Sequence, residues 1–194
     1  MKRVIDFLIS LFGLIFLSPV LLVISILIKS TSSGGVFFIQ ERVGMNSIIF
    51  KMIKFRTMFV DHNDSNSISI KGDVRITSLG YFLRAYKLDE LPELINVFLG
   101  HMSLVGPRPD VKGYADKLVG SQRMILKLRP GITGPASLKY IKEEELLSKQ
   151  ANPKVYNDDI IYPDKVKINL DYYYNNSIWI DIKIIFVTVF RISS

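Results

Sequence analysis

Cysteine is absent from the 194-residue sequence, which excludes disulfide bonds and thiolate chemistry. Histidine is almost absent, because only His62 and His101 occur, far apart and without ligand-like neighbours. We therefore do not expect a histidine-based metal site. Internal repeats and low-complexity tracts are also missing, which excludes repeat architectures. The length suits a single domain.

Acidic residues are outnumbered by basic ones. Lys and Arg total 25 and Asp and Glu total 18, which gives a net charge of +7. Such a surplus suits a phosphate-rich partner, such as nucleic acid, a nucleotide or an anionic lipid. An ordinary solvated basic surface has the same composition, so the charge alone does not identify a partner. Hydrophobic residues make up 48% of the sequence, which is ample for a core.

The most prominent apolar stretch covers residues 7–28 and contains no charged residue. About 20 apolar residues suffice for a helix to cross a bilayer. The stretch is long for the apolar part of a signal peptide, and no Ala-x-Ala-like cleavage site follows it. We therefore expect it to remain in the mature protein as a membrane segment.

Ser18 and Pro19 stand at the middle of this stretch. Proline removes a backbone donor and bends a helix, but a neighbouring hydroxyl such as that of Ser18 can replace the lost bond. Lys2 and Arg3 precede the stretch and Lys29 follows it, so the positive-inside rule gives no direction. Two shapes remain open from the residues: a kinked span, and a hairpin that enters and leaves on the cytoplasmic side.

The rest of the chain alternates short strand-like and helical patterns. We predict strands at 36–40 and 48–53 joined by a turn at 41–47, a polar loop at 61–73, a helical region at 79–100 interrupted near Asp89, and helices at 112–128, 164–175 and 178–192. The last segment suits either the core or the membrane surface, with Trp179 at the headgroups. We expect an α/β fold with a small sheet and several helices, some of them amphipathic and lying on the membrane surface.

One carboxylate pair attracts attention, in the sequence Leu-Asp-Glu-Leu-Pro at 88–92. Pro92 fits the first turn of a helix, so a helix is predicted to begin near Asp89. Free N–H groups and the helix dipole at that end would hold Asp89 ionised and attract phosphate. Arg84 lies about one turn earlier. Asp and Glu also begin ordinary helices, so Asp89 and Glu90 alone do not establish catalysis.

Several basic residues lie in segments whose backbone has little conformational freedom. Arg108 stands between two prolines, and such rigid presentation of a guanidinium suits phosphate recognition. Arg129 begins an Arg-Pro-Gly turn with free backbone N–H groups, which can bind anions. Lys54 and Arg56 lie on or beside a predicted strand. Each also has an ordinary structural explanation, but together they surround one carboxylate pair with cations.

Four motifs in this order resemble the signature blocks of the bacterial sugar transferases, the monotopic polyprenyl-phosphate phosphoglycosyl transferases. They lie at 54–58, 88–92, 103–109 and 129–134. With the N-terminal segment, the resemblance covers nearly the whole chain. The chain is similar to the minimal form of the family, typified by the Campylobacter enzyme that starts N-linked glycan assembly. One departure is Lys87, where we expected a small polar residue.

The resemblance implies two regions. Residues 1–30 would form a re-entrant membrane helix broken at Ser18-Pro19, and residues 31–194 a catalytic domain seated on the cytoplasmic face of the bacterial inner membrane. It implies transfer of a sugar-1-phosphate from a UDP-sugar, with an N-acetylated hexose favoured, to undecaprenyl phosphate. UMP would be released in this first membrane step of glycoconjugate biosynthesis, and later glycosyltransferases would use the product.

The resemblance also implies a ping-pong mechanism. Asp89 would attack the β-phosphate and carry the phosphosugar as an acyl phosphate until the lipid phosphate takes it. Glu90 would bind Mg²⁺, which neutralises charge on the diphosphate. Arg84 and Arg108 match family arginines near the phosphates. Lys54, Arg56 and Arg129 are also assigned to the phosphates.

Two other classes of function deserve comparison. A non-catalytic membrane-anchored protein that binds anionic lipid or nucleic acid would explain the charge and the anchor, but not the four ordered motifs. No nucleic-acid-binding motif is found, so no nucleic-acid partner is expected. A membrane-bound phosphatase would use the same covalent aspartate and discharge it to water. An assay for lipid-linked product against free sugar phosphate separates it from a transferase.

Overall fold

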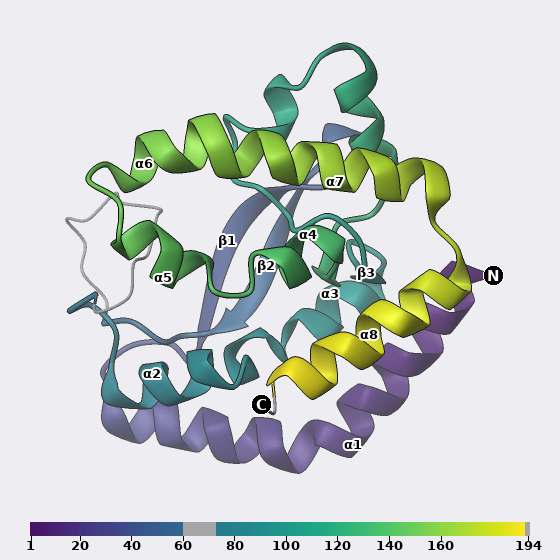
Figure 1. Ribbon diagram of the computed structural model, residues 1–194. Helices are drawn as coiled ribbons and strands as arrows, with labels where there is room; N and C mark the ends of the chain where they lie inside the picture. Colours follow the sequence, from purple (N-terminus) through teal and green to yellow (C-terminus); the bar gives the residue numbers. More distant parts are fainter. Residues whose placement is uncertain (60–72, 193–194) are drawn as a thin grey trace.

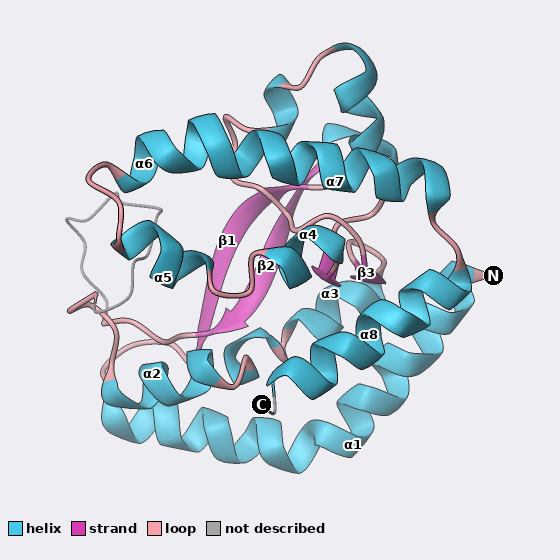
Figure 2. Ribbon diagram, viewed as in Figure 1, coloured by secondary structure: helices cyan, strands magenta, loops and turns pink. Residues whose placement is uncertain are grey.

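The computed structural model describes residues 1–59 and 73–192. Helices surround two small two-stranded sheets, which confirms the predicted α/β class (Figures 1 and 2). The predicted loop at 61–73 lies almost entirely outside the described residues, and so does His62.

The helices and strands follow one another along the whole chain. The helices are α1 (Lys2–Thr31), α2 (Ser78–Ala85), α3 (Glu93–Leu99), α4 (Pro135–Lys139), α5 (Glu143–Ser148), α6 (Pro153–Tyr156), α7 (Tyr162–Asn175) and α8 (Ile178–Ile192). The strands are β1 (Phe37–Val43), β2 (Ile49–Phe55), β3 (Ser103–Val105) and β4 (Gly131–Thr133). Short 3-10 turns lie at Met45–Ser47, Leu88–Glu90, Ala115–Lys117 and Gly120–Lys127, and a π turn at Asn157–Ile161.

The hairpin of β1 and β2 confirms the two predicted strands but is longer than predicted. The strands are antiparallel, and β1 continues to Val43 through residues that were assigned to the turn. Glu41 lies opposite Lys51 in the register, and such a pair of opposite charges suits the solvated face of an antiparallel sheet. The turn itself is tight, since Asn46 takes a left-handed conformation with φ 56°.

Helix α1 remains helical through Pro19 and changes direction near its middle (Figure 1). The predicted break is therefore a bend in a continuous helix. Pro19 has no N–H to donate to the carbonyl of Ile15, and the hydroxyl of Ser18 donates to that carbonyl instead, at 2.8 Å. The side chain of Ser18 thus compensates the lost bond as the sequence predicted.

The first turns of α1 are tied to the rest of the molecule by polar groups. Lys2 donates to the carbonyl of Val105 at 2.9 Å and forms an ion pair of 2.5 Å with Asp181 of α8. Asp6 is buried and accepts hydrogen bonds from Ser103 Oγ at 2.8 Å and Leu104 N at 3.2 Å. These contacts join α1 to β3, the strand that leads directly into the loop of Arg108.

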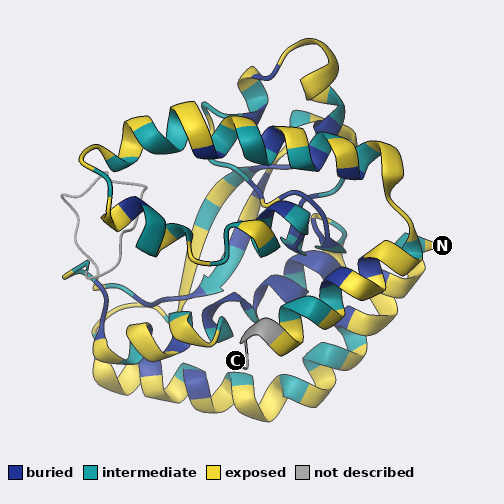
Figure 3. Cartoon of the chain, in the orientation of Figure 1, coloured by how far each residue is buried: buried dark blue, intermediate teal, exposed yellow. Residues whose placement is uncertain are grey.

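The second part of α1 packs on β2 and α2 through apolar contacts. Ile24 and Ile28 are buried against Phe55 of β2 and Leu83 of α2. Most other apolar side chains of α1 and many of α8 face outward (Figure 3). Helix α1 is the one described helix that is long and apolar enough to cross a membrane, and 11% of its most apolar window is buried. An exposed apolar surface of this size suits contact with lipid.

Two predicted helical regions differ from the structure. Residues 79–100 divide into α2, the 3-10 turn at Leu88–Glu90, and α3, and the last of these ends at Gly100 with φ 87° as predicted. Residues 112–128, predicted as a helix, form only two 3-10 turns. Gly113 and Gly120 take positive φ values of 102° and 57° there, and such left-handed residues interrupt an α-helix. Helices α7 and α8 agree with the prediction.

Candidate active site

The carboxylate pair lies between two short helices. Asp89 and Glu90 occupy a 3-10 turn and are both buried. Lys87 precedes them in a left-handed conformation, with φ 54°, so the hydrogen-bond ladder of α2 stops there. Helix α3 begins at Glu93, with Pro92 as its N-cap. The prediction of a helix start near Asp89 is therefore wrong by about one turn.

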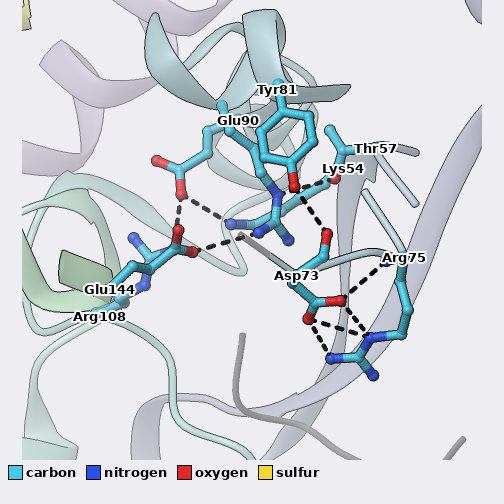
Figure 4. A network of polar contacts seen from close by, with 9 residues as sticks. Lys54, Thr57, Asp73, Arg75, Tyr81, Glu90, Arg108 and Glu144 are labelled. Atoms are coloured by element: carbon cyan, nitrogen blue, oxygen red, sulfur yellow. Dashed lines mark hydrogen bonds and ion pairs between the residues drawn. The ribbon is translucent and has the colours of Figure 1, made fainter. Parts of the chain in front are cut away.

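Two cations from distant parts of the sequence meet the carboxylate of Glu90 (Figure 4). Lys54 Nζ, from β2, donates to Glu90 Oε1 at 2.8 Å and also lies 3.2 Å from Glu93 Oε1. Arg108 Nη2 donates to the same Glu90 oxygen at 2.7 Å. The side chain of Arg108 is 44% exposed, so its guanidinium remains accessible to a ligand. The structure thus brings Lys54, Glu90 and Arg108 together.

Arg84 lies on the other side of the carboxylate pair, where α5 approaches. Its Nε donates to Thr57 Oγ1 at 3.1 Å and its Nη1 to Glu144 Oε1 at 3.3 Å. Glu143 pairs with Lys165 of α7 at 2.6 Å. Glu143 and Glu144 of α5 therefore both pair with cations on other elements.

Arg56 and Arg129 donate to backbone carbonyls and not to the carboxylate pair. The guanidinium of Arg56 donates to the carbonyls of Ser32 and Ser33 at the end of α1. Arg129 Nε donates to the carbonyl of Gly100 at 3.0 Å. Both residues hold backbone segments in place, and their predicted phosphate contacts stay predictions.

Burial and neighbouring charges shift the pKa values of Asp89 and Glu90 in opposite directions. Burial, followed by the charge of Glu90, raises the pKa of Asp89, while Lys54, Lys87 and Arg84 oppose the rise. Burial also acts to raise the pKa of Glu90, but Arg108 and Lys54 hold it below its ordinary value. Asp89 lies on a 3-10 turn before α3, so the predicted effect of a helix dipole on its charge stays a prediction.

The third carboxyl group at this site, Glu93, was not predicted from the sequence. It is buried beside Lys54, and burial raises its pKa to about 7, with Lys54 opposing and Glu90 adding to the rise. In the sequence, Glu93 occupies an ordinary first turn of a helix, so no signal distinguished it. Glu93 follows Glu90 by three residues, but only the structure shows that Lys54 pairs with both carboxylates.

The residues at the site fit a magnesium ion. Asp89 Oδ1 is buried and has no hydrogen-bond partner, and carboxylate oxygens are the ligands that Mg²⁺ prefers. Within residues 1–59 and 73–192, no group of three or more His, Cys, Asp or Glu side chains is placed to hold an ion. An ion here would need oxygens from a phosphorylated substrate, which is how Mg²⁺ is commonly held.

A cavity of about 2020 Å³ opens over the carboxylate pair. Asp89, Glu90, Lys54, Arg84 and Arg108 all line it. Polar side chains from β1, α4 and α7 that the sequence did not single out also line it. The cavity has room for a nucleotide-sized ligand, with two carboxylates and several cations at one end.

The sequence profile described as "Bacterial sugar transferase" matches residues 1–194. The chain is 40% identical to the UDP-glucose:undecaprenyl-phosphate glucose-1-phosphate transferase of Klebsiella pneumoniae, over 98% of this chain and 39% of that protein. It is 38% identical to the exopolysaccharide production protein PSS of Rhizobium leguminosarum bv. phaseoli, over 97% and 93%. It is 33% identical to the UDP-N-acetylgalactosamine-undecaprenyl-phosphate N-acetylgalactosaminephosphotransferase of Aeromonas hydrophila, over 97% and 42%. The chain thus spans about two fifths of the first and third of these relatives.

Proposed function

Because this chain belongs to the bacterial sugar transferase family, we propose that it transfers a sugar-1-phosphate from a UDP-sugar to undecaprenyl phosphate and releases UMP. The observation that carries this proposal is the buried pair Asp89 and Glu90, held beneath Lys54 and Arg108 at one end of an open cavity. Relatives over 97–98% of the chain are named as transferases between these two kinds of substrate.

The cations explain how a carboxylate can attack an anionic diphosphate. Arg108 and Arg84 line the cavity beside the pair, and binding the diphosphate between them screens its charge. Arg84, together with Lys54 and Lys87, favours the ionised form of Asp89, which the attack requires. When bound at Glu90, Mg²⁺ would supply further neutralisation of the diphosphate and of the leaving group.

We propose a two-step reaction at the β-phosphorus. A carboxylate oxygen of Asp89 forms a bond to this phosphorus, and the bond to the bridging oxygen breaks, so that its electron pair leaves with UMP. The product is an acyl phosphate that carries the sugar. An oxygen of undecaprenyl phosphate then attacks the same phosphorus, and the electron pair of the acyl–phosphate bond returns to Asp89.

The apolar surface suggests where this reaction occurs. The outward-facing apolar side chains of α1 would lie in the bilayer, which would seat residues 31–194 on the cytoplasmic face of the inner membrane. There the phosphate of the acceptor lies at the headgroup level and meets the cavity directly. We propose that residues 1–30 form a re-entrant anchor and that later glycosyltransferases act on the lipid-linked product.

The sugar itself remains a prediction. The motif resemblance favours an N-acetylated hexose, whereas relatives are named as transferring glucose or N-acetylgalactosamine. The test is a panel of UDP-sugars with undecaprenyl phosphate and Mg²⁺, scored by UMP release and by lipid-linked product. We expect one UDP-hexose to be preferred and EDTA to abolish transfer. Free sugar phosphate without lipid-linked product would indicate a phosphatase and contradict the proposal.

The covalent step is tested by leaving out the acceptor. We expect about one UMP per active site and a phosphosugar adduct on Asp89, detected by mass spectrometry and labile to hydroxylamine. A direct displacement by the lipid phosphate predicts neither adduct nor UMP before acceptor is added. That result would overturn the two-step reaction while leaving the transferase activity itself in place.

A further inference from the structure

The loop that carries Arg108 is held in place by its carbonyl groups. Pro107 and Pro109 flank the arginine, and a proline has no backbone N–H to donate. Three carbonyls of the loop accept hydrogen bonds from other elements: Pro107 O from Gly131 N at 2.8 Å, Asp110 O from Val43 N at 2.9 Å, and Pro109 O from Arg42 Nη1 at 3.0 Å. Two of these donors are backbone N–H groups, and the third is the side chain of Arg42.

Arg42 lies near the end of β1 and joins this strand to the loop. Its second terminal nitrogen, Nη2, donates to Gln40 Oε1 on the same strand at 2.5 Å. The planar guanidinium therefore spans two acceptors in a fixed geometry, which a single ammonium group does not reproduce. The sequence did not single out Arg42, because one basic residue in a predicted turn is ordinary.

The charge of Arg42 belongs to the surroundings of the carboxylate pair. Burial, followed by the charge of Arg108, lowers the pKa of Arg42 to about 10, while Asp110, Glu93 and Glu90 oppose the fall. Arg42 and Arg108 also line the same cavity. Arg42 is therefore close enough to Arg108 for the two charges to act on each other.

The hydrogen bonds of Arg42 indicate how it acts. Both terminal nitrogens donate to acceptors within the protein, and Nε is buried away from solvent. Arg108, in contrast, is 44% exposed and reaches Glu90 Oε1 at 2.7 Å (Figure 4). A shift of about 1 Å in a group that positions a substrate can slow a reaction about a hundredfold. The carbonyl of Pro109, next to Arg108, is thus a sensitive point of contact.

We propose that Arg42 is a positioning residue for the transfer: by holding the carbonyl of Pro109 it keeps the guanidinium of Arg108 where the diphosphate of the donor binds. This inference rests on the proposed function, because it assigns the support of a residue in the same site. The observation that carries it is the pair of hydrogen bonds from Arg42 to Pro109 and Gln40.

The test is a double-mutant cycle between Arg42 and Arg108. We expect Arg42→Ala to lower kcat/KM for the preferred UDP-sugar about tenfold, as the loss of one hydrogen bond from a charged group predicts. The inhibition constant of UDP, which keeps the diphosphate, should rise with it. In the Arg108→Ala background the same change should alter kcat/KM by no more than about twofold, because the group that Arg42 positions is already gone.

Lys112→Ala is the matched control. Lys112 pairs with Glu41 at 3.0 Å and so joins β1 to the chain just after the same loop, but both side chains are exposed, at 60% and 59%. It should leave kcat/KM nearly unchanged in both backgrounds. If Arg42→Ala melts below the assay temperature, Arg42→Lys replaces it in the cycle. This variant keeps the charge but not the planar fork, and we expect the same pattern with a smaller loss.

Three results would overturn the inference. Equal losses from Arg42→Ala in the wild-type and Arg108→Ala backgrounds would show that Arg42 acts independently of Arg108, as a direct phosphate ligand or through general stability. Unchanged kinetics in a folded Arg42→Ala enzyme would remove Arg42 from the site. Wild-type kinetics in Arg42→Lys would show that the charge suffices without the guanidinium fork.

The inference and the proposed function fail in different ways. A wild-type enzyme that turns over no UDP-sugar would overturn the proposed function, and the role of Arg42 with it. An active wild type with additive effects of Arg42→Ala and Arg108→Ala would overturn the role of Arg42 alone.

Discussion

At the scale of single residues, Asp89 and Glu90 are neighbours with opposite electrostatic surroundings. Glu90 accepts from both Lys54 and Arg108, so its charge is compensated in the free protein. Asp89 is buried with an unpartnered oxygen, and its pKa is raised. Groups whose environments push their pKa values apart commonly have different roles in one reaction. The carboxylate of Glu90, whose charge Lys54 and Arg108 compensate, suits a fixed metal ligand. The carboxylate of Asp89, whose Oδ1 has no hydrogen-bond partner, suits a nucleophile.

Replacement of the nucleophile decides between these roles. Asp89→Asn keeps the shape of the side chain but removes the attacking carboxylate, so we expect transfer to fall close to background and no adduct to form. UMP release and mass spectrometry of the purified variant measure both. Glu90→Gln should also be poor in transfer, through weaker metal binding. Substantial transfer by a verified Asp89→Asn enzyme would refute the assignment.

Arg108→Ala should weaken binding of the diphosphate and slow transfer. It should not disturb the fold, because Pro107 and Pro109 shape the loop and Arg108 is partly exposed. Loss of one charge-assisted phosphate contact costs about 1.5–3 kcal/mol, or roughly ten- to a hundredfold in rate. Steady-state kinetics and a melting curve test this together. Normal kinetics in the folded variant would remove Arg108 from the site.

Glu93 makes the stability of the protein depend on pH. Its pKa is about 7 in the folded protein against an ordinary value of 4.5, so between these values the folded state binds more protons than the unfolded state. The free energy of unfolding therefore falls as pH rises through this window. We expect Glu93→Gln, which cannot ionise, to match the wild type near pH 4.5 and to be more stable by about 1–3 kcal/mol at pH 8.

Chemical denaturation at both pH values measures this difference. Glu145→Gln is a suitable control, because Glu145 lies away from the carboxylate pair and its carboxylate pairs with the exposed Lys149. An identical difference between Glu93→Gln and wild type at the two pH values would show that Glu93 does not titrate in this window.

At the scale of elements, α1 and the loop of Arg108 depend on each other. The bend at Ser18-Pro19 lets one part of α1 contact β3 through Lys2 and Asp6, while the other part packs on α2 and β2. A straight helix cannot keep both sets of contacts. The packing of α1 against β3, α2 and β2 therefore requires the bend.

Pro19→Ala restores the backbone donor and removes the cause of the bend. We expect the helix to straighten, the contacts of Ile24 and Ile28 to weaken, and both transfer and melting temperature to fall. Val20→Ala, one residue further along on an exposed position of α1, should leave both nearly unchanged. Equal activity and stability of Pro19→Ala and wild type would show that packing alone maintains the bend.

At the scale of the whole molecule, the start of the chain meets the start of α8, the last helix. Lys2, at the start of α1, pairs with Asp181 of α8, and both helices carry exposed apolar side chains. Figure 1 shows the N-terminus beside the start of α8 and the bent α1 along the edge of the molecule. The two helices with exposed apolar side chains and the body that carries the carboxylate pair therefore form one packed unit.

This packing predicts the topology. Lys2 is held by Asp181 and Val105, and Lys29 lies at the other end of α1, where Arg56 holds the exit of the helix. Both ends should therefore face the cytoplasm. Single cysteines introduced at positions 2 and 29 of this cysteine-free chain should react with an impermeant reagent from the same side of the membrane. Labelling from opposite sides would demonstrate a true span.

The sequence by itself determined the local features of this protein. Short apolar runs on either side of a turn predicted the β1–β2 hairpin, and helical spacing predicted α7 and α8. Ser18-Pro19 predicted both the bend and the hydrogen bond by which the Ser18 hydroxyl replaces the lost backbone bond. The ordered motifs predicted the carboxylate pair and the family. All of these depend on residues close in the chain, where periodicity and backbone chemistry are sufficient.

Only the tertiary structure decided which groups meet and which are charged. It placed Lys54 and Arg108 on Glu90 and left Arg56 and Arg129 on backbone carbonyls. It also revealed Glu93 beside Lys54, which no motif marks. Contacts between distant segments and the loss of solvent on burial set these properties, and neither quantity can be read from neighbouring residues in the sequence.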